Sequence, residues 1–311
     1  ANRDAIRLLH EGAGRERCRY PVDQSELENR DLPHLEDVMD GAELLSLSAY
    51  WHAVSGEPQA ATDALAASYA LADSLVQEPQ ITSQLTRYSV HAVGLSALEH
   101  ALCRRRLPHG VLDQMTALLR KVTTAKGALH RALMGERAWM LPVLQRFSML
   151  QWTGHQQKAK LACLDMVEKY DRALQEPFPR RLQACRRVAA ELSAKADEGG
   201  WADTLLLLVR PMFYVIVPVQ ATNQVRLRSA LTALAIERFR LDNGRLPGNL
   251  SELVPGHLDE LPIDPFDGEP LRYKRLDPGY VVYSIGRDDH DDGGEEKDRR
   301  EEGDVAFRVT R

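Results

Sequence analysis

The residues best suited to chemistry lie in an acidic loop near the C-terminus, residues 285–294, which read IGRDDHDDGG. Four aspartates fall within five positions there, and two glycines follow them. Calcium prefers about six to eight oxygen ligands on a flexible loop, and clustered aspartates with free backbone carbonyls supply such ligands. Carboxylates held this close repel one another unless a cation lies between them. The loop therefore indicates either a calcium site or a solvated acidic surface, and its spacing is not that of an EF-hand.

The candidate catalytic residues are His91, His130 and Glu136, all in segments that the sequence predicts to be helical. The chain has no GxSxG, P-loop or HExxH motif that would name a reaction. His91 and His100 are nine positions apart, which places them on different helix faces and argues against shared zinc ligation. A deep pocket lined by two or more of the candidates would favour a hydrolase-like enzyme with its site in a groove of the helical domain. The alternative is that each makes a polar contact with a neighbouring helix.

Charge and cysteine content exclude other classes of site. The net charge is −5, whereas a nucleic-acid surface needs a clear positive field, so we expect no nucleic-acid partner. No two of the four cysteines form a CxxC pair, which argues against a zinc ribbon or a thioredoxin-type site. Cys163 and Cys185 fall on neighbouring predicted helices. They form either a disulfide, if the protein is exported, or two buried free thiols.

The elements that must position these residues are mainly helices, because Ala and Leu are abundant and aromatic residues make up only 6%. From residue 36 onward, apolar residues recur every three or four positions, and prolines precede or open several of these runs, at Pro58, Pro79, Pro108 and Pro177. This pattern predicts an antiparallel helical array, either a bundle or a short solenoid. The most apolar stretch, residues 205–219, is shorter than the roughly 20 residues that cross a bilayer, and prolines interrupt it. We interpret it as a buried core segment, the alternative being a membrane-inserted hairpin, and we expect a new long helix to begin after Pro218.

The C-terminal region changes character. The long helix is predicted to end at Asp242-Asn243-Gly244, and residues 244–284 are rich in proline and glycine. Residues 271–274 and 280–283 predict a strand pair across a turn, and residues 305–309 predict a third strand. The predicted fold class is therefore mainly α, a helical array followed by a small α+β domain with a short antiparallel sheet. The predicted divisions are an irregular segment over 1–35, a helical domain over 36–215 and the α+β domain over 216–311.

Four linked motifs in the last third of the chain occur in a fixed order. They are a long helix ending in ERFRLDNGRLP at 237–247, the segment LSEL at 250–253, the turn LPIDPFDG at 261–268 and the segment YVVYSIGRD at 280–288. In this order they resemble the globular domain of the major pseudopilins of type II secretion. About 200 residues of predicted helix precede this region, where pseudopilins carry a prepilin segment. The whole arrangement is similar to that of large envelope proteins of planctomycetes that end in such a domain.

The resemblance implies a calcium ion in the acidic loop, because pseudopilins bind calcium there. Matched by position, Asp288 is the best side-chain ligand, and Asp304 would close the site. The full implied set comprises side-chain ligands Asp288, Asp291, Asp292 and Asp304, with backbone carbonyls of Ile285 and His290. The resemblance also implies a periplasmic or cell-envelope location. The chain starts at Ala1 without an apolar run, so we expect no signal peptide or anchor within it and leave open a membrane anchor outside it.

Taken together, the sequence favours a non-enzymatic cell-envelope protein. Its small domain would be stabilised by calcium, its helical domain would bind a protein or peptide partner, and the resemblance suggests a link to secretion or pilus machinery. An enzyme with a site in the helical domain is the second hypothesis. A purely structural protein with a solvated acidic loop is the third. The sequence does not indicate an oligomeric state.

Overall fold

Helices form most of the fold, as the composition predicts. The computed structural model describes residues 2–21, 32–122, 127–146, 156–197, 201–295 and 303–311, with the backbone alone for 196–197 and 201–214. In chain order the helices are α1 (Arg3–Ala13), α2 (His34–Ser55), α3 (Pro58–Ser74), α4 (Ile81–Arg104), α5 (His109–Val122), α6 (Ala128–Arg146), α8 (Gln156–Gln175), α9 (Arg180–Asp197) and α10 (Trp201–Asn243). A short 3-10 turn, η1 (Leu250–Leu253), follows them.

Prolines mark the helix starts that the sequence predicts. Pro58 is the first residue of α3, α4 begins two residues after Pro79, and α5 begins directly after Pro108. A proline costs little at these positions because the first amides of a helix have no partner within it. At its other end α10 stops at Asn243, where Gly244 takes a φ of +68° and its amide bonds to the carbonyl of Arg240 at 2.9 Å.

The first segment differs from its prediction as an irregular stretch. Arg3–Ala13 form helix α1, in which Arg7 and Glu11 pair across one turn at 2.6 Å. The side chain of Leu9 lies so close to Gly41 of α2 that an added Cβ there would be 3.0 Å from it. A short helix is marginal by itself and depends on such packing, which a local sequence window does not reveal. Within the predicted segment, residues 22–31 lie outside the described residues.

Helix α10 is the longest element and runs for 43 residues, about 65 Å at a rise of 1.5 Å per residue. It continues through Pro211 and Pro218, where the sequence predicted an interruption and a new helix start, although each proline removes one backbone hydrogen bond. Ile216 and Val217 are buried, in keeping with a core segment, whereas the side chains of 205–214 lie outside the described residues. The predicted boundary at 215/216 falls inside this helix. One cluster of buried apolar residues extends from α2, on one side of α10, to the sheet on the other side of α10.

Three strands form an antiparallel sheet in the order β1 (Arg272–Arg275), β2 (Tyr280–Ser284) and β3 (Val305–Val309), as predicted. Arg272 pairs with Tyr283 across the first ladder, and Tyr280 pairs with Val309 across the second. The turn between β1 and β2 requires glycine at 279, because its φ is +99° and a Cβ there would lie 1.9 Å from the carbonyl oxygen of Val309.

The outer edge of β3 is covered by side chains of α4. The amide of Arg308 donates to Oε1 of Glu99 at 2.5 Å, and the thiol of Cys103 donates to the carbonyl oxygen of Arg308 at 3.4 Å. Unpaired strand edges are templates for association, so these contacts close one side of the sheet.

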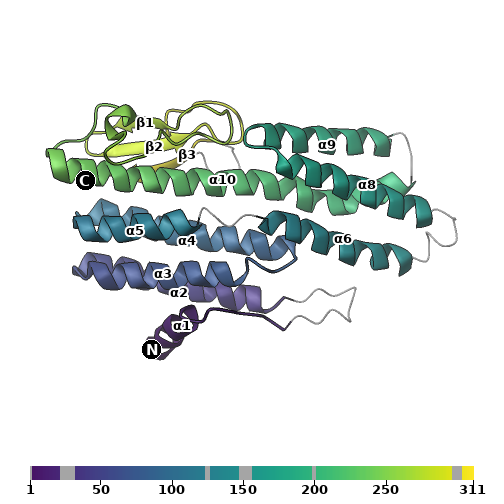
Figure 1. Cartoon of the computed structure of the whole chain (residues 1–311), viewed down its shortest axis with the longest axis horizontal. Coiled ribbons are helices and arrows are strands. Elements are labelled where there is room, and N and C mark those ends of the chain that lie inside the picture. Colours follow the sequence, from purple (N-terminus) through teal and green to yellow (C-terminus); the bar gives the residue numbers. More distant parts are fainter. Residues whose placement is uncertain (1, 22–31, 123–126, 147–155, 198–200, 296–302) are drawn as a thin grey trace.

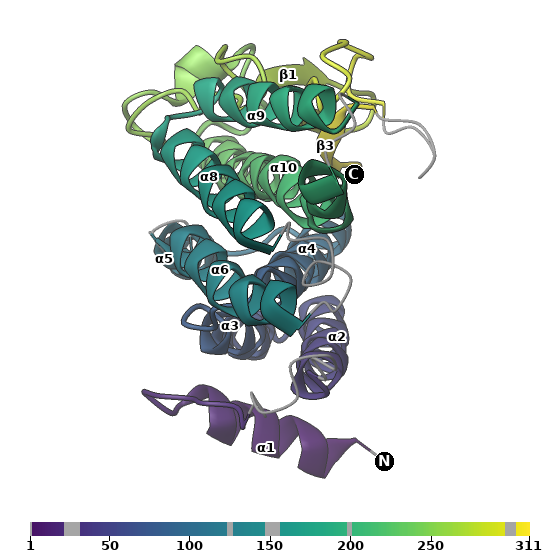
Figure 2. The same cartoon turned by 90° about the vertical axis from the view of Figure 1, so that its right-hand side faces the viewer.

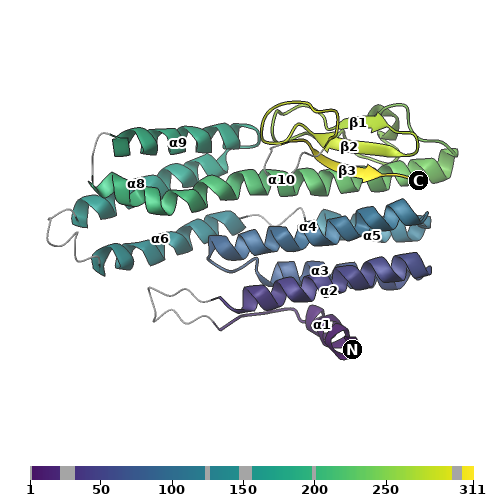
Figure 3. The same ribbon diagram turned by 180° about the vertical axis from the view of Figure 1, so that it is seen from behind.

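Successive layers of helices build the molecule. Figure 2 shows α1 at one end, then α2 with α3, then α4 with α5 and α6, then α8 with α10, and finally α9 and the sheet. From behind, α9 and the sheet lie over opposite halves of α10 (Figure 3). Helix α10 contacts α4, α5, α8, α9, β2 and β3, so it joins the helical layers to the sheet (Figure 1).

A buried polar contact fastens the sheet and the C-terminal residue to α10. The hydroxyl of Tyr280, on β2, donates to Oε1 of Glu237 at 3.0 Å, and the guanidinium of Arg311 pairs with Oε2 of the same carboxylate. Glu237 is 3% exposed and Tyr280 is fully buried. Because a buried charge is costly without partners, both contacts stabilise the carboxylate inside the core.

Replacing Tyr280 by phenylalanine removes one of these donors and keeps the ring. Since hydrogen bonds to charged groups contribute about 1.5–3 kcal/mol, we expect Tyr280→Phe to lower the free energy of unfolding by about 2 kcal/mol in urea titrations. The matched control is Tyr50→Phe, because the Tyr50 hydroxyl makes no hydrogen bond within the described structure. Equal stability of the two variants would contradict the role assigned to the Tyr280 hydroxyl.

Candidate metal centre

The best-connected polar residue beside the acidic loop is Asp264, a fully buried carboxylate in the turn before β1. Its Oδ1 accepts hydrogen bonds from the amide of Phe266 and the hydroxyl of Ser284, each at 2.9 Å. Its Oδ2 accepts from the amide of Ile285 at 3.2 Å and from Arg272 at 2.8 Å. Burial raises the pKa of this carboxyl, and the donors counteract part of that effect. Asp264 thus ties the turn to the end of β2, where the acidic loop begins.

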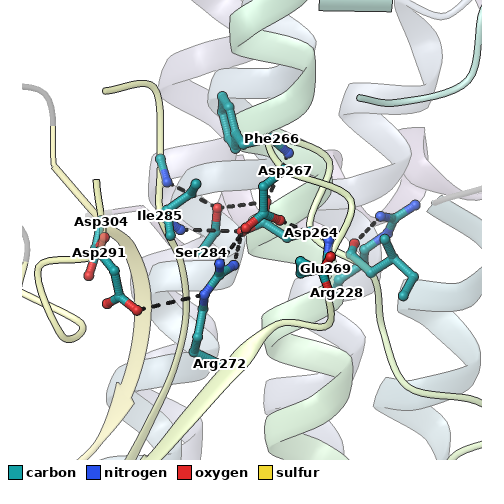
Figure 4. A network of polar contacts seen from close by, with 12 residues as sticks. Arg228, Asp264, Phe266, Asp267, Glu269, Arg272, Ser284, Ile285, Asp291 and Asp304 are labelled. Carbon is teal, nitrogen blue, oxygen red and sulfur yellow. Dashed lines mark hydrogen bonds and ion pairs between the residues drawn. The ribbon is translucent and has the colours of Figure 1, made fainter. Parts of the chain in front are cut away.

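Arg272, on β1, connects this turn with the acidic loop (Figure 4). Its guanidinium pairs with Asp264 and Asp267, and its Nε lies 3.9 Å from Oδ2 of Asp291. One positive charge therefore faces three carboxylates. The excess negative charge at the base of the loop would stabilise a cation bound there.

The loop residues with predicted ligand roles differ in their surroundings. Asp288 accepts a hydrogen bond from the amide of His290 at 3.2 Å, and Asp291 accepts one from an amide two residues further on at 2.9 Å. These short contacts are typical of aspartate turns. Nδ1 of His290 lies 3.2 Å from Oδ1 of Asp292. Asp288, His290 and Asp291 are exposed, whereas Ile285 is buried.

Asp304 is a buried loop residue whose carboxylate lacks part of its hydrogen bonding among the described residues. It is 4% exposed, and its Oδ2 accepts a hydrogen bond from the amide of Gly294 at 2.6 Å. Its Oδ1 is buried and has no hydrogen-bond partner among the described residues. Burial raises the pKa of Asp304, the backbone amides of Gly294 and Asp292 oppose this, and the negative charges of Asp291 and Asp292 raise it further. The charges of Asp291 and Asp292 thus act on Asp304, which follows them by more than ten residues in the sequence.

A cation fits this arrangement in charge and in ligand type. An orphaned buried carboxylate oxygen beside two further carboxylates offers the hard oxygen ligands that calcium prefers. Across the described part of the chain, no group of three or more His, Cys, Asp or Glu side chains is positioned to hold a metal ion. Backbone carbonyls, such as the predicted ones of Ile285 and His290, would therefore have to contribute to a complete site.

Sequence reasoning missed the contacts that hold the loop. Asp264 and Arg272 have no predicted role, although the DP turn around Asp264 is part of the quoted motif. Asp289 also has no predicted role. Its backbone takes a φ of +58°, and its Oδ2 forms an ion pair with Arg186 of α9 at 3.1 Å. About a hundred residues separate Arg186 from Asp289, and no local signal in the sequence links them.

The three candidate catalytic residues contact three different elements. Nδ1 of His91 lies 3.3 Å from Oδ1 of Asn223 on α10, and Nδ1 of His130 lies 2.6 Å from Oδ1 of Asp171 on α8. Oε1 of the fully buried Glu136 accepts a hydrogen bond from the amide of Ile81, the first residue of α4, at 3.0 Å. Each is thus a polar contact between elements of the helical layers, as in the alternative that the sequence left open.

Cys163 on α8 and Cys185 on α9 are both buried free thiols in the structure. Burial raises the pKa of each thiol to about 11, so both stay protonated at neutral pH and are poor nucleophiles.

Comparison with protein-family models, with curated proteins and with solved structures finds no match to this chain. Within the described residues, no helix carries an apolar stretch long enough to cross a membrane.

Replacing Arg272 by alanine tests the Asp264 network. The change leaves a buried carboxylate without its cation, so we expect the free energy of unfolding to fall by about 3–5 kcal/mol in urea titrations. Lys274→Ala is the matched control, because Lys274 lies two residues further along β1 and is exposed. A loss of less than 1 kcal/mol on the same scale, as for an exposed ion pair, would show that Asp264 does not depend on Arg272.

Proposed function

We propose that this protein is a non-enzymatic component of the cell envelope whose C-terminal region is stabilised by calcium. Side chains of Asp288, Asp291, Asp292 and Asp304 and carbonyls of Ile285 and His290 would hold the ion. Calcium would supply positive charge that offsets the repulsion among the carboxylates and orders the loop between β2 and β3. Ordering this loop would fix the position of β3, because β3 follows it directly.

The observation that carries the proposal is the buried Oδ1 of Asp304, which has no hydrogen-bond partner among the described residues. An unpartnered buried carboxylate oxygen is costly, and here two neighbouring aspartates increase the cost. In a solvated loop Asp304 would be exposed to water, as Asp288 and Asp291 are. Arg272 does not remove the excess charge, since it already faces Asp264 and Asp267.

The order of elements supports the resemblance to major pseudopilins. The four motifs lie in chain order on the end of α10, on η1, on the turn before β1 and on β2 with the start of the acidic loop, and the third strand follows. A periplasmic or envelope location and a link to secretion or pilus machinery follow from this resemblance.

A protein or peptide partner for the helical layers is the second part of the proposal. Leu47 and Trp51 lie one turn apart on α2 and are 65% and 68% exposed. Large apolar side chains that share one exposed helix face are typical of surfaces that bind other proteins.

Calcium should raise the melting temperature of the metal-stripped protein, because a ligand that binds only the folded state stabilises it. We expect Asp304→Asn to abolish this rise. Without metal, this variant should be at least as stable as the metal-free wild type, because it loses a buried negative charge. Its side-chain oxygen can still accept a hydrogen bond from the amide of Gly294. Differential scanning calorimetry with and without calcium measures both effects.

Two further variants complete the experiment. Asp288→Ala should weaken the calcium effect through loss of a predicted ligand, and Asp259→Asn, at an exposed aspartate outside the loop, should leave it unchanged. A calcium response that is the same in wild type and Asp304→Asn, or no response at all, would refute the proposed site and favour a solvated loop.

The calcium effect should also depend on pH through Asp304. The pKa of Asp304 is raised in the folded state, so in the metal-free protein its protonated form favours folding. This contribution to the free energy of unfolding is fully present below the unfolded pKa of about 3.9 and is lost as the pH rises through the folded pKa. Calcium binds the deprotonated carboxylate, and its stabilisation should therefore grow over the same interval. Calorimetric scans from about pH 4 to pH 7 should show this growth, which Asp304→Asn should flatten. A calcium effect independent of pH in the wild type would contradict ligation by Asp304.

A further inference from the structure

Arg87 of α4 is a buried cation without a counter-charge in contact. Its residue exposure is 3%, its Nε is buried without a hydrogen-bond partner, and its guanidinium forms no ion pair within the described structure. The nearest interaction is with the ring of Tyr88, whose centroid lies 5.9 Å away. Asp73 acts on Arg87 only at longer range. Because a buried charge is costly without a partner, this arrangement calls for a ligand.

A cavity of about 110 Å³ adjoins Arg87, between α4 and α10. Side chains spaced one turn apart on each helix line it, namely Arg87 and His91 from α4 and Gln220, Asn223, Gln224 and Arg228 from α10. Arg181 of α9 donates to Oε1 of Gln220 at 3.1 Å, which adds a further cation behind the lining. The cavity is polar although it lies within the apolar layers of the fold.

The electrostatics of the cavity favour an anion. Its lining holds two arginines and no described Asp or Glu side chain. Arg228 uses one nitrogen for the carbonyl oxygen of Ile263 and has Asp264 and Glu260 nearby, so its charge is partly balanced, unlike that of Arg87. Burial and the charge of Arg87 lower the pKa of His91 to about 3, so this ring is neutral. Its Nε2 is buried and has no hydrogen-bond partner among the described residues.

We propose that this cavity binds a small oxyanion, with the charge and planar fork of Arg87 as its principal contact. An arginine fork matches the paired oxygens of both a carboxylate and a phosphate. A cavity of this volume holds a few water molecules, so the ligand is an ion of similar size, such as inorganic phosphate or acetate, and not a nucleotide. Water alone would satisfy the hydrogen bonds of Arg87 but would leave its charge unbalanced.

The test titrates the full chain with millimolar phosphate and, separately, acetate, at constant ionic strength set with sodium chloride. We expect at least one of the two oxyanions to bind in isothermal titration calorimetry and to raise the melting temperature. Phosphate alone would identify a phosphate site, and acetate alone a carboxylate site. Absence of binding and of any melting shift with both oxyanions would overturn the proposal.

Variants at Arg87 separate ligand binding from folding. Arg87→Met keeps the apolar stem and removes the charge, so we expect at least tenfold weaker oxyanion binding and, in oxyanion-free buffer, a melting temperature equal to or above that of the wild type. Arg87→Lys retains the charge without the fork and should also weaken binding. Arg226→Met, at an exposed arginine of α10, is the matched control. Oxyanion binding that is unchanged in both Arg87 variants would show that Arg87 does not form the site.

Discussion

Burial of one long helix on nearly every side is the constraint on which the rest of the structure depends. In the C-terminal half of α10, Ala233, Leu234, Ala235 and Ile236 are consecutive and all fully buried. A helix that is apolar around its whole circumference is stable only when other elements enclose it. Helices α4, α5, α8 and α9 and strands β2 and β3 enclose α10 along its length, with α9 and the sheet over opposite halves of it. Helical layers and sheet therefore share one core.

The fold handles its buried charges in two ways. Asp264 and Glu237 are each surrounded by donors that include an arginine, and in this form they fasten the turn before β1 and the C-terminal residue to the core. Asp304 and Arg87 differ, because each is buried and retains polar atoms without partners in the described structure. Most buried polar atoms in folded proteins have a hydrogen-bond partner, and those that lack one call for an explanation such as a bound water or ion. A cation and an anion would complete these two sites.

Local features of the chain were predictable from the sequence, because their causes are local. Pro58 begins α3 because its fixed φ suits the first turn of a helix. Gly244 follows the end of α10 and Gly279 forms the turn between β1 and β2, because glycine readily adopts a positive φ. The continuity of α10 through Pro218 was not predictable, since burial of the neighbouring Ile216 and Val217 in the core offsets the cost of a proline. The acidic loop was found by composition, but its contact between Asp289 and Arg186 joins distant segments and needs the fold to be known.

The way in which α4 covers β3 has a consequence for any attempt to divide the molecule. Expression of the region from α10 onward would remove Glu99 and Cys103 from the strand edge and expose the face of α10 that α4 covers. The isolated fragment would then present a free strand beside an apolar helix, a combination that promotes pairing between identical chains. The helical layers therefore keep the C-terminal region from associating with itself.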